Sequence, residues 1–152
     1  MSITLRKGTD ADAELIIGYL KKLAEYEKLS ESCNITEEKL IGLMNEENGL
    51  CVVIAERDGI PAGMMTWYTY KIATFSGRRV FYIEDVFIDD SKRGGGIGTA
   101  LFAEAKRLAE ELDCARLEWK CLDWNKSAQK FYGKIGGNIS DDGWLTYTIN
   151  LK

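Results

Sequence analysis

A short glycine-rich segment limits what this chain can fold into more than any other feature. The segment reads, in order, Arg93, Gly94, Gly95, Gly96, Ile97 and Gly98. It follows an apolar, β-branched run at residues 80–88 and precedes an amphipathic stretch at residues 99–112. A strand, a glycine loop and a helix in that order place backbone N–H groups at the positive end of a helix, which binds phosphate. A strand–helix connection that only needs flexible turns is the simpler alternative.

Two common phosphate-binding patterns do not match this segment. A dinucleotide-binding GxGxxG needs a third glycine where this chain has Thr99 or Leu101, and a P-loop needs a Gly-Lys-Ser/Thr that does not follow. What remains is the pattern Arg-x-x-Gly-x-Gly.

Length and charge narrow the class of protein. The chain has 152 residues, which suits one domain over residues 1–152, and its formal net charge of −4 argues against a general nucleic-acid surface. The acidic balance weakly favours a cationic partner. We find no stretch near the roughly 20 apolar residues that a membrane span needs, and no signal-peptide pattern at the start. We therefore expect a cytoplasmic protein without a membrane or nucleic-acid partner.

The residue types that could carry catalysis are restricted. The chain has no histidine, which removes Ser-His-Asp and Cys-His catalysis and every histidine-containing metal site. Its four cysteines show no Cys-x-x-Cys spacing, so we expect reduced structural thiols and no metal, with a nucleophile or metal ligand as the alternative. Proton transfer must then use carboxylates, tyrosine, lysine, cysteine or water.

The hydrophobic pattern predicts a single α/β unit. We expect strands at residues 3–7, 50–57, 61–70, 80–88, 116–122 and 144–151, and helices that begin after Thr9 and Thr36 and at residues 99–112 and 127–135. Asp58 and Gly59 are typical of a tight hairpin turn between two of the strands. The order predicts a central mixed, mostly antiparallel sheet with helices on both faces.

Further signatures surround the glycine loop at characteristic distances. Residues 82–88 read YIEDVFI, residues 123–125 read DWN, Phe131 and Tyr132 follow, and residues 142–144 read DGW. Residues 23–27 and 73–78 add two more. Together they resemble the diamine (spermidine/spermine) and thialysine branch of the GCN5-related N-acetyltransferases (GNAT). The resemblance covers nearly the whole chain and implies the GNAT fold, acetyl-CoA as acetyl donor and a homodimer.

The resemblance also implies where acetyl-CoA binds. The glycine loop through Thr99 would hold the pyrophosphate with backbone N–H groups, and Arg93 would add a charge-assisted bond. The backbone of Val86, Phe87 and Ile88 would pair with the pantetheine amides as a strand edge does. Asn125 would bond the pantetheine arm, with Ser127 and Ala128 beside it. A helix N-cap is the other role open to Asn125, and both can hold.

Acetyl transfer from a thioester to an amine needs a proton acceptor and a proton donor. An amine with a pKa near ~10 must lose a proton before it attacks, and the departing thiolate leaves better if it is protonated. We assign the acid role to Tyr132 and the base role to Glu84, acting through water. Aromatic packing is the alternative for Tyr132, and a structural ion pair is the alternative for Glu84 and Asp85. Neighbours on a strand alternate, so the two carboxylates are expected on opposite faces.

A cationic substrate needs carboxylates along a groove and aromatic faces beside them. The candidates for substrate binding, each of which could be ordinary surface charge or packing, are Tyr26, Glu27, Glu84, Asp85, Glu118, Asp142 and Trp144. Where polyamine enzymes carry an acidic Asp-Pro-Trp segment, this chain reads Ala73, Thr74 and Phe75, and Lys120 would favour a substrate carboxylate. These departures favour a lysine-like amino acid such as thialysine over a polyamine.

The predicted activity is thus that of an acyltransferase that acetylates a small primary amine by direct attack. Three alternatives stay open from the sequence, of which a nucleotide-binding module that uses the glycine loop alone would bind ATP but not CoA. The other two concern acetyl-CoA. One is an acetyltransferase for protein N-termini or lysines, which would turn over peptides better than free amines. The other is a non-catalytic acyl-CoA-binding domain.

Overall fold

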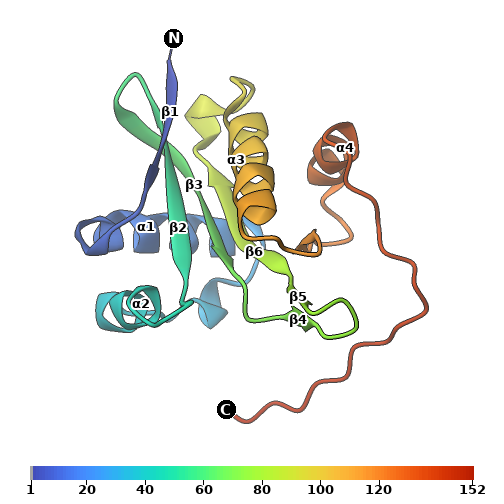
Figure 1. Cartoon of the computed structure of the whole chain (residues 1–152). Coiled ribbons are helices and arrows are strands. Elements are labelled where there is room, and N and C mark those ends of the chain that lie inside the picture. The colour runs from blue at the N-terminus through green and yellow to red at the C-terminus, as the bar shows by residue number, and fades with distance from the viewer. Residues whose placement is uncertain (1) are drawn as a thin grey trace. The chain divides into compact units, whose positions relative to one another are not determined.

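A five-stranded sheet forms the centre of the protein. The computed structural model describes residues 2–152 and divides into two compact units, Met1–Leu122 and Asp123–Lys152. In the first unit the strand order is β1 (Ile3–Lys7), β2 (Cys51–Arg57), β3 (Ile60–Tyr68), β6 (Phe81–Ile88) and β7 (Leu117–Trp119). Every neighbouring pair is antiparallel except β6 and β7, which are parallel (Figure 1). This is the mixed, mostly antiparallel sheet that the sequence predicts.

Helices cover both faces of this sheet. Val52, Ile54, Met64 and Phe87 pack in one core cluster with residues of α1 (Ala13–Tyr26) and α2 (Glu37–Met44). Val53, next in the strand to Val52, faces the other side and is also buried, under α3 (Ile97–Glu111). Figure 1 shows α3 on the side of the sheet opposite to α1 and α2.

Local signals in the sequence explain where several elements begin. The Thr9 N–H donates to the Asp12 carboxylate at 2.8 Å ahead of α1, and the Thr36 hydroxyl accepts from the Lys39 N–H at the start of α2. Asp58 and Gly59 have φ of +52° and +80°, which gives the tight turn expected between β2 and β3. Single-turn 3₁₀ helices, η1 (Asp10–Asp12), η2 (Ser30–Ser32) and η3 (Asp90–Lys92), lie in connections.

One small sheet was not expected. The short strands β4 (Ile72–Ala73) and β5 (Arg78–Arg79) form an antiparallel hairpin between β3 and β6. Two residues per strand leave too little alternation for a sequence pattern to identify. In residues 2–152 no helix has the length and apolar composition that crossing a bilayer requires.

The second unit contains α4 (Lys126–Lys134) and an irregular segment, residues 138–152. Residues 144–151 alternate in polarity, but they form no strand, so the predicted final strand is wrong in this structure. A strand exists only where a neighbour supplies the opposing N–H and C=O groups, and alternation says nothing about that neighbour. The apolar side chains of this segment, Trp144 and Tyr147 among them, are left more than 75% exposed.

Candidate active site

The glycine loop between β6 and α3 has the conformation expected of a phosphate-binding turn. Gly94 and Gly96 adopt φ of +78° and +88°, a conformation that residues other than glycine rarely adopt. Gly96 directly precedes α3, and its carbonyl accepts from the Ala100 N–H at 3.0 Å. The N–H groups of Ile97, Gly98 and Thr99 therefore lie in the first helical turn, where no intrahelical acceptor exists. This end of α3 presents donors and a positive dipole to an anion.

A buried arginine beside this loop was not anticipated from the sequence. The guanidinium of Arg57, at the end of β2, lies against Gly95 so closely that a Cβ at position 95 would collide with it. Its Nε and Nη2 atoms are buried without a hydrogen-bond partner. Buried donors of a cation that lack partners are costly, and an anion at the loop would offset that cost. No local pattern marks Arg57, because a charged residue at the end of a strand is ordinary.

Arg93, the cation predicted to bind pyrophosphate, lies at the start of the loop. It pairs with Asp90 at 3.1 Å, and its guanidinium carbon is 5.4 Å from the centre of the Tyr26 ring at the end of α1. Both partners are at the surface, and exposed ion pairs contribute little free energy. Arg93 can therefore turn toward a bound phosphate at small cost.

One edge of β6 is left without a partner strand. β7 pairs with Phe81, Tyr82 and Ile83 only, whereas β6 continues to Ile88 and stays paired with β3 on its other side. Within residues 2–152 no strand occupies this edge beyond Ile83. The backbone of Val86–Ile88 therefore offers one free edge, which suits the amide groups of a pantetheine chain.

A bulge in β6 puts both predicted carboxylates on the same face of the sheet. Asp85 is opposite Thr66 and Tyr82 is opposite Tyr68, so a two-residue step along β3 is matched by a three-residue step along β6. Thr66 and Tyr68 lie two residues apart on β3, so their side chains point to the same face of the sheet. Residues directly opposite each other on neighbouring strands also share a face, which places Asp85 and Tyr82 on that face too. Glu84 is the extra residue and has no partner in β3, but its carboxylate accepts from the Tyr68 hydroxyl and so reaches the same face. The expectation that Glu84 and Asp85 face opposite sides is therefore wrong. Phe87 continues on this face, against Tyr19 of α1.

Each of the two carboxylates, called here the carboxylate pair, is held by a hydroxyl of β3. The Tyr68 hydroxyl donates to Glu84 at 2.9 Å, and the Thr66 hydroxyl donates to Asp85 at 2.6 Å. Burial raises the pKa of Asp85 to about 6, opposed by the Thr66 bond and assisted by Glu84 and Glu27. Burial and the bond to Glu84 also raise the pKa of Tyr68.

The alternative of a structural ion pair for these carboxylates finds no support among the described residues. Arg78 pairs instead with Asp113 at 3.4 Å, and Arg79 donates to the Thr69 carbonyl at 2.9 Å. Lys120 is exposed just beyond β7. The carboxylate pair therefore keeps its charge available for a cationic ligand.

Aromatic rings and a mixed ionic group continue along the same face. The rings of Tyr68 and Tyr82 stack with centres 5.3 Å apart. Glu118 of β7 is directly opposite Tyr82 and accepts from Lys71 at 2.6 Å and from Arg116 at 3.2 Å. Burial opposes the ionisation of Glu118, but these bonds outweigh it and lower its pKa. The charge of Glu118 is thus already balanced by two cations.

The remaining predicted site residues divide between the two units. Glu27 follows the end of α1, and burial raises its pKa, while its charge acts on Asp85. The second unit contains Asn125, Ser127, Ala128, Tyr132, Asp142 and Trp144. Of these, Asn125 is the N-cap of α4 and accepts from the Ala128 N–H at 3.3 Å, which confirms the capping role that the sequence left open.

Within the second unit, Tyr132 lies on α4 with its ring centre 5.7 Å from that of Phe131. The Trp144 N–H donates to the Asp142 carboxylate at 3.3 Å. The sequence therefore placed Tyr132 on a helix beside an aromatic neighbour as observed, while its acid role stays a prediction.

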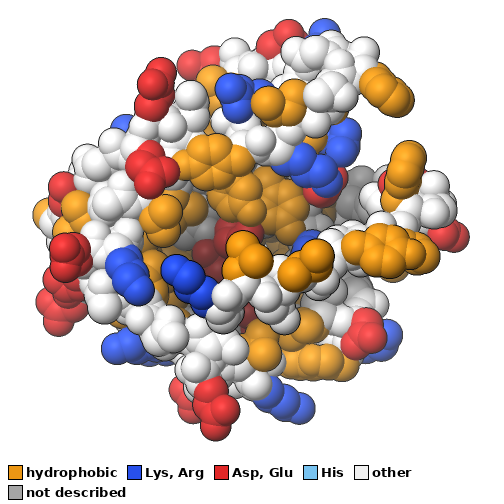
Figure 2. All heavy atoms as spheres, turned by 90° about the horizontal axis from the view of Figure 1, so that it is seen from below, with side chains coloured by type: hydrophobic (Ala, Val, Ile, Leu, Met, Phe, Trp, Pro, Cys, Tyr) orange, Lys and Arg blue, Asp and Glu red, His pale blue; other side chains and the backbone are white. Residues whose placement is uncertain are grey.

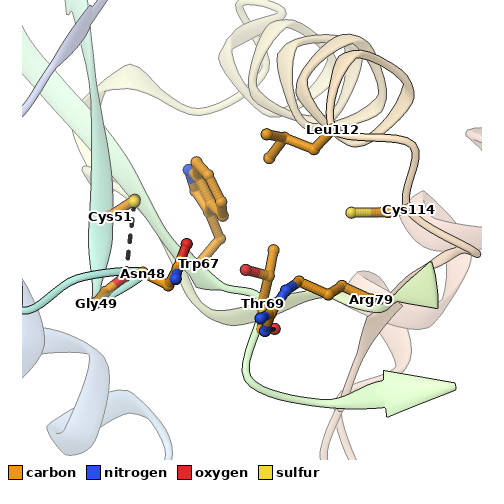
Figure 3. Close-up of a pocket in the computed structure, with 8 residues that line it drawn as sticks. All are labelled: Asn48, Gly49, Cys51, Trp67, Thr69, Arg79, Leu112 and Cys114. Atoms are coloured by element: carbon orange, nitrogen blue, oxygen red, sulfur yellow. Dashed lines mark hydrogen bonds between the residues drawn. The ribbon is translucent and has the colours of Figure 1, made fainter. Parts of the chain in front are cut away.

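A surface cavity of about 300 Å³ lies away from these residues. It is lined by residues that the sequence did not select for the site (Figure 3): Asn48, Gly49, Cys51, Trp67, Thr69, Arg79, Leu112 and Cys114. Trp67 alternates with Thr66 and Tyr68 along β3, so this cavity opens on the opposite face of the sheet from the carboxylate pair. Within residues 2–152 the four cysteines form no disulfide, and no cluster has three of the side chains that hold a metal ion.

Comparison with known proteins matches most of the chain to one family. Residues 18–137 match the acetyltransferase (GNAT) family. The thialysine N-epsilon-acetyltransferase of Sus scrofa is 31% identical over 156 residues, covering 96% of this chain and 91% of the relative. The protein of the same name from Caenorhabditis elegans is 32% identical over 146 residues, covering 93% and 88%.

Solved structures agree with the predicted fold. An aminoglycoside acetyltransferase from a soil metagenomic sample, in complex with trehalose, superposes with a TM-score of 0.80 over 99% of this chain and 97% of that one. Its sequence is only 18% identical, so the likeness concerns the fold alone.

Proposed function

Because the chain belongs to the GNAT family of acetyl-CoA-dependent N-acetyltransferases, we propose that it acetylates the side-chain amine of a lysine-like amino acid. One observation carries the proposal: the β6 bulge presents Glu84 and Asp85 on one face, a few residues before the glycine loop. A site for a cationic amine thus adjoins a site for an anionic acetyl donor.

Several features fit the anionic part of acetyl-CoA. The donors of residues 94–99 and the positive end of α3 suit its pyrophosphate, and the unpartnered guanidinium of Arg57 suits an added negative charge. Arg93 and the free edge at Val86–Ile88 complete this part of the site. We keep Asn125, Ser127 and Ala128 as proposed neighbours of the pantetheine arm.

When bound, acetyl-CoA supplies the acetyl group as a thioester. The carboxylate pair offsets the charge of the substrate ammonium and accepts its proton, and the freed amine attacks directly. A backbone N–H of β6, at Val86 or Phe87, stabilises the charge that develops on the carbonyl oxygen. The phenol of Tyr132 gives its proton to the departing thiolate.

The polar groups along this face favour an amino acid over a polyamine. Glu84 lies two residues from Tyr82, about 6.6 Å along β6, and Glu118 lies opposite Tyr82 on β7, about 4.8 Å across. An amine at Glu84 and an amino-acid head group at Glu118 would thus be about 8 Å apart. A lysine side chain spans about 6 Å between its Cα and its amine. At the far end, Glu118 would meet the α-ammonium while Lys71 and Arg116 meet the α-carboxylate. A polyamine has no carboxylate for these cations.

The exposed apolar segment at the C-terminal end supports a homodimer. Six of its apolar side chains are at least 78% exposed: Ile139, Trp144, Leu145, Tyr147, Ile149 and Leu151. Hydrophobic side chains are also visible at the surface on the side of the molecule shown in Figure 2. An exposed alternating segment is ready to pair with a second chain. We propose that a second copy covers it.

Three predictions from the sequence are kept with this proposal. The family match over residues 18–137 crosses the boundary between the two units, which supports one catalytic domain over residues 1–152. A cytoplasmic location and the absence of nucleic-acid or membrane partners also stay predictions.

The test is release of thiol from acetyl-CoA in the presence of matched amines. Thialysine and lysine should react faster than cadaverine, which is lysine without its carboxylate, and faster than spermidine. Lys71→Met should raise KM for lysine and leave KM for cadaverine unchanged. Fast turnover of spermidine would contradict the substrate class, turnover confined to peptides would indicate a protein substrate, and acetyl-CoA binding without any transfer would indicate a binding domain.

A further inference from the structure

The hydroxyl of Thr66 holds Asp85 at two points. Thr66 is completely buried in β3, and its hydroxyl donates to the Asp85 carboxylate at 2.6 Å while accepting from the Asp85 N–H at 3.1 Å. A buried hydroxyl needs such partners, and this one uses both its donor and an acceptor site on one residue. The side chain and the backbone of Asp85 are therefore fixed together at the β6 bulge.

The groups around Asp85 are acidic or neutral. Glu84 adjoins it on β6, Glu27 faces it from the end of α1, and the phenol of Tyr68 approaches from β3. Among residues 2–152 no ion pair reaches Asp85. Burial without a cation holds the pKa of Asp85 at about 6. A proton acceptor works best when its pKa lies near the working pH.

Glu84 has a different environment. Its side chain is exposed, and its carboxylate accepts from the Tyr68 hydroxyl at 2.9 Å. An exposed carboxylate attracts an ammonium ion, and no buried hydroxyl fixes it in place as Thr66 fixes Asp85. The two members of the carboxylate pair therefore suit two roles.

We propose that Asp85, with Thr66 as its positioning residue, takes the proton from the substrate ammonium, while Glu84 holds the ammonium by charge. This division rests on the proposed function and differs from the sequence-based assignment of the base role to Glu84. In the step, an ammonium N–H bond breaks and its proton passes to a carboxylate oxygen of Asp85. The nitrogen lone pair forms the bond to the acetyl carbon, the C–S electrons leave with sulfur, and the phenol of Tyr132 gives its proton to the thiolate. The second N–H proton, released from the nitrogen as the amide forms, passes through water to the Tyr132 phenolate and restores the phenol.

The test is the pH dependence of kcat/KM for a lysine-like substrate in matched variants. The wild-type acidic limb should lie near pH 6, the pKa of Asp85. The Thr66 bond favours the ionised form of Asp85, so Thr66→Val should move the limb upward, by about one pH unit if a typical bond to a charged group is lost, and Thr66→Ser should restore it. Tyr68→Phe, which removes the donor to Glu84, should leave the limb in place.

A second pair of variants covers the case in which Thr66→Val fails to fold. Asp85→Asn should lower kcat/KM by about 10²-fold or more and abolish the acidic limb. Glu84→Gln should raise KM and keep the limb, moved to a slightly lower pH because the charge of Glu84 helps to raise the pKa of Asp85. NMR titration of the Asp85 carboxyl carbon should match the kinetic limb.

Different failures would be distinguishable. The proposal would be overturned in favour of Glu84 if Tyr68→Phe shifts the acidic limb or Glu84→Gln abolishes it, while the changes at Thr66 and Asp85 leave it unchanged. An active enzyme whose limb differs from the Asp85 titration would overturn it as well. Wild-type protein that transfers acetyl to no amine would overturn the proposed function itself, and the role of Asp85 with it.

Discussion

Replacing Arg57 with methionine is expected to change stability and cofactor affinity in opposite directions. Arg57 has two buried nitrogen atoms without partners, and its guanidinium lies against Gly95 of the glycine loop. Arg57→Met keeps an apolar stem of similar length and removes the charge. If the guanidinium binds a phosphate of the cofactor, removing it should raise the stability of the ligand-free protein and weaken the binding of CoA.

The gain in the free protein follows from the two unpartnered nitrogen atoms. Each buried donor without a partner costs about 1–3 kcal/mol, so removing them should raise the free energy of unfolding by about 2 kcal/mol. For a chain of this length, that corresponds to a rise in Tm of about 4–8 °C, measured by thermal unfolding without ligand.

The loss in the bound protein should appear as weaker binding of CoA. A charge-assisted hydrogen bond contributes about 1.5–3 kcal/mol, so Kd should rise about 10- to 100-fold by titration calorimetry. Pantetheine, which lacks the phosphates, should bind both proteins equally. Arg107→Met is the matched control, because Arg107 lies on α3 and pairs with Glu104 and Glu111 at the surface, so it should not change CoA affinity.

The reasoning would be refuted by the opposite pair of results. If Arg57→Met unfolds at a lower temperature than the wild type and binds CoA with unchanged affinity, then Arg57 supports the loop structurally and meets no phosphate.

Three further changes test other parts of the structure. Gly63→Ala should destabilise the protein by about 1–3 kcal/mol in denaturant unfolding, because its Cβ would lie 2.5 Å from the Phe87 carbonyl oxygen of the neighbouring strand. Asp12→Asn should lower stability by about 1–2 kcal/mol at pH 7, because the bond from Arg6 lowers the pKa of Asp12 to about 2. Tyr132→Phe should lower kcat about 10²-fold at neutral pH with little change in CoA affinity, if the phenol protonates the thiolate.

Each of these has a result that would count against it. If Gly63→Ala had wild-type stability, β3 and β6 could move apart to admit the methyl group without a loss of free energy of unfolding. The pKa of Asp12 is depressed in the folded state, so its contribution is complete above about pH 4 and is lost as pH falls toward 2. The free energies of unfolding of the wild type and Asp12→Asn should therefore converge as the pH falls toward 2. A difference that stays constant with pH would contradict the contribution of the Arg6–Asp12 ion pair. Full activity of Tyr132→Phe at every pH would exclude the acid role.

Elements with strong local signals were predictable from the sequence. Thr36 and the Asp58–Gly59 turn act through their own neighbours, and the glycine loop needs glycine at Gly94 and Gly96 for positive φ. Such features are recognised without knowing what packs against them. They were sufficient to predict the order of the large elements and the mixed sheet.

The features that the sequence did not predict correctly depend on residues far away along the chain. The β6 bulge is a mismatch between two strands, so nothing in the sequence around Glu84 and Asp85 reveals that both share a face. The partners Thr66 and Arg57 lie 19 and 38 positions from the residues they meet, Asp85 and Gly95. The alternation of residues 144–151 predicted a strand, but it could not supply the neighbour that a strand requires.

The most direct test of the account is the position of the acetyl group on the product. Purified protein, acetyl-CoA and thialysine should yield a product whose tandem mass spectrum places the acetyl group on the side-chain nitrogen, because that amine reaches the carboxylate pair. Acetylation of the α-nitrogen, or no product while acetyl-CoA binds, would contradict it.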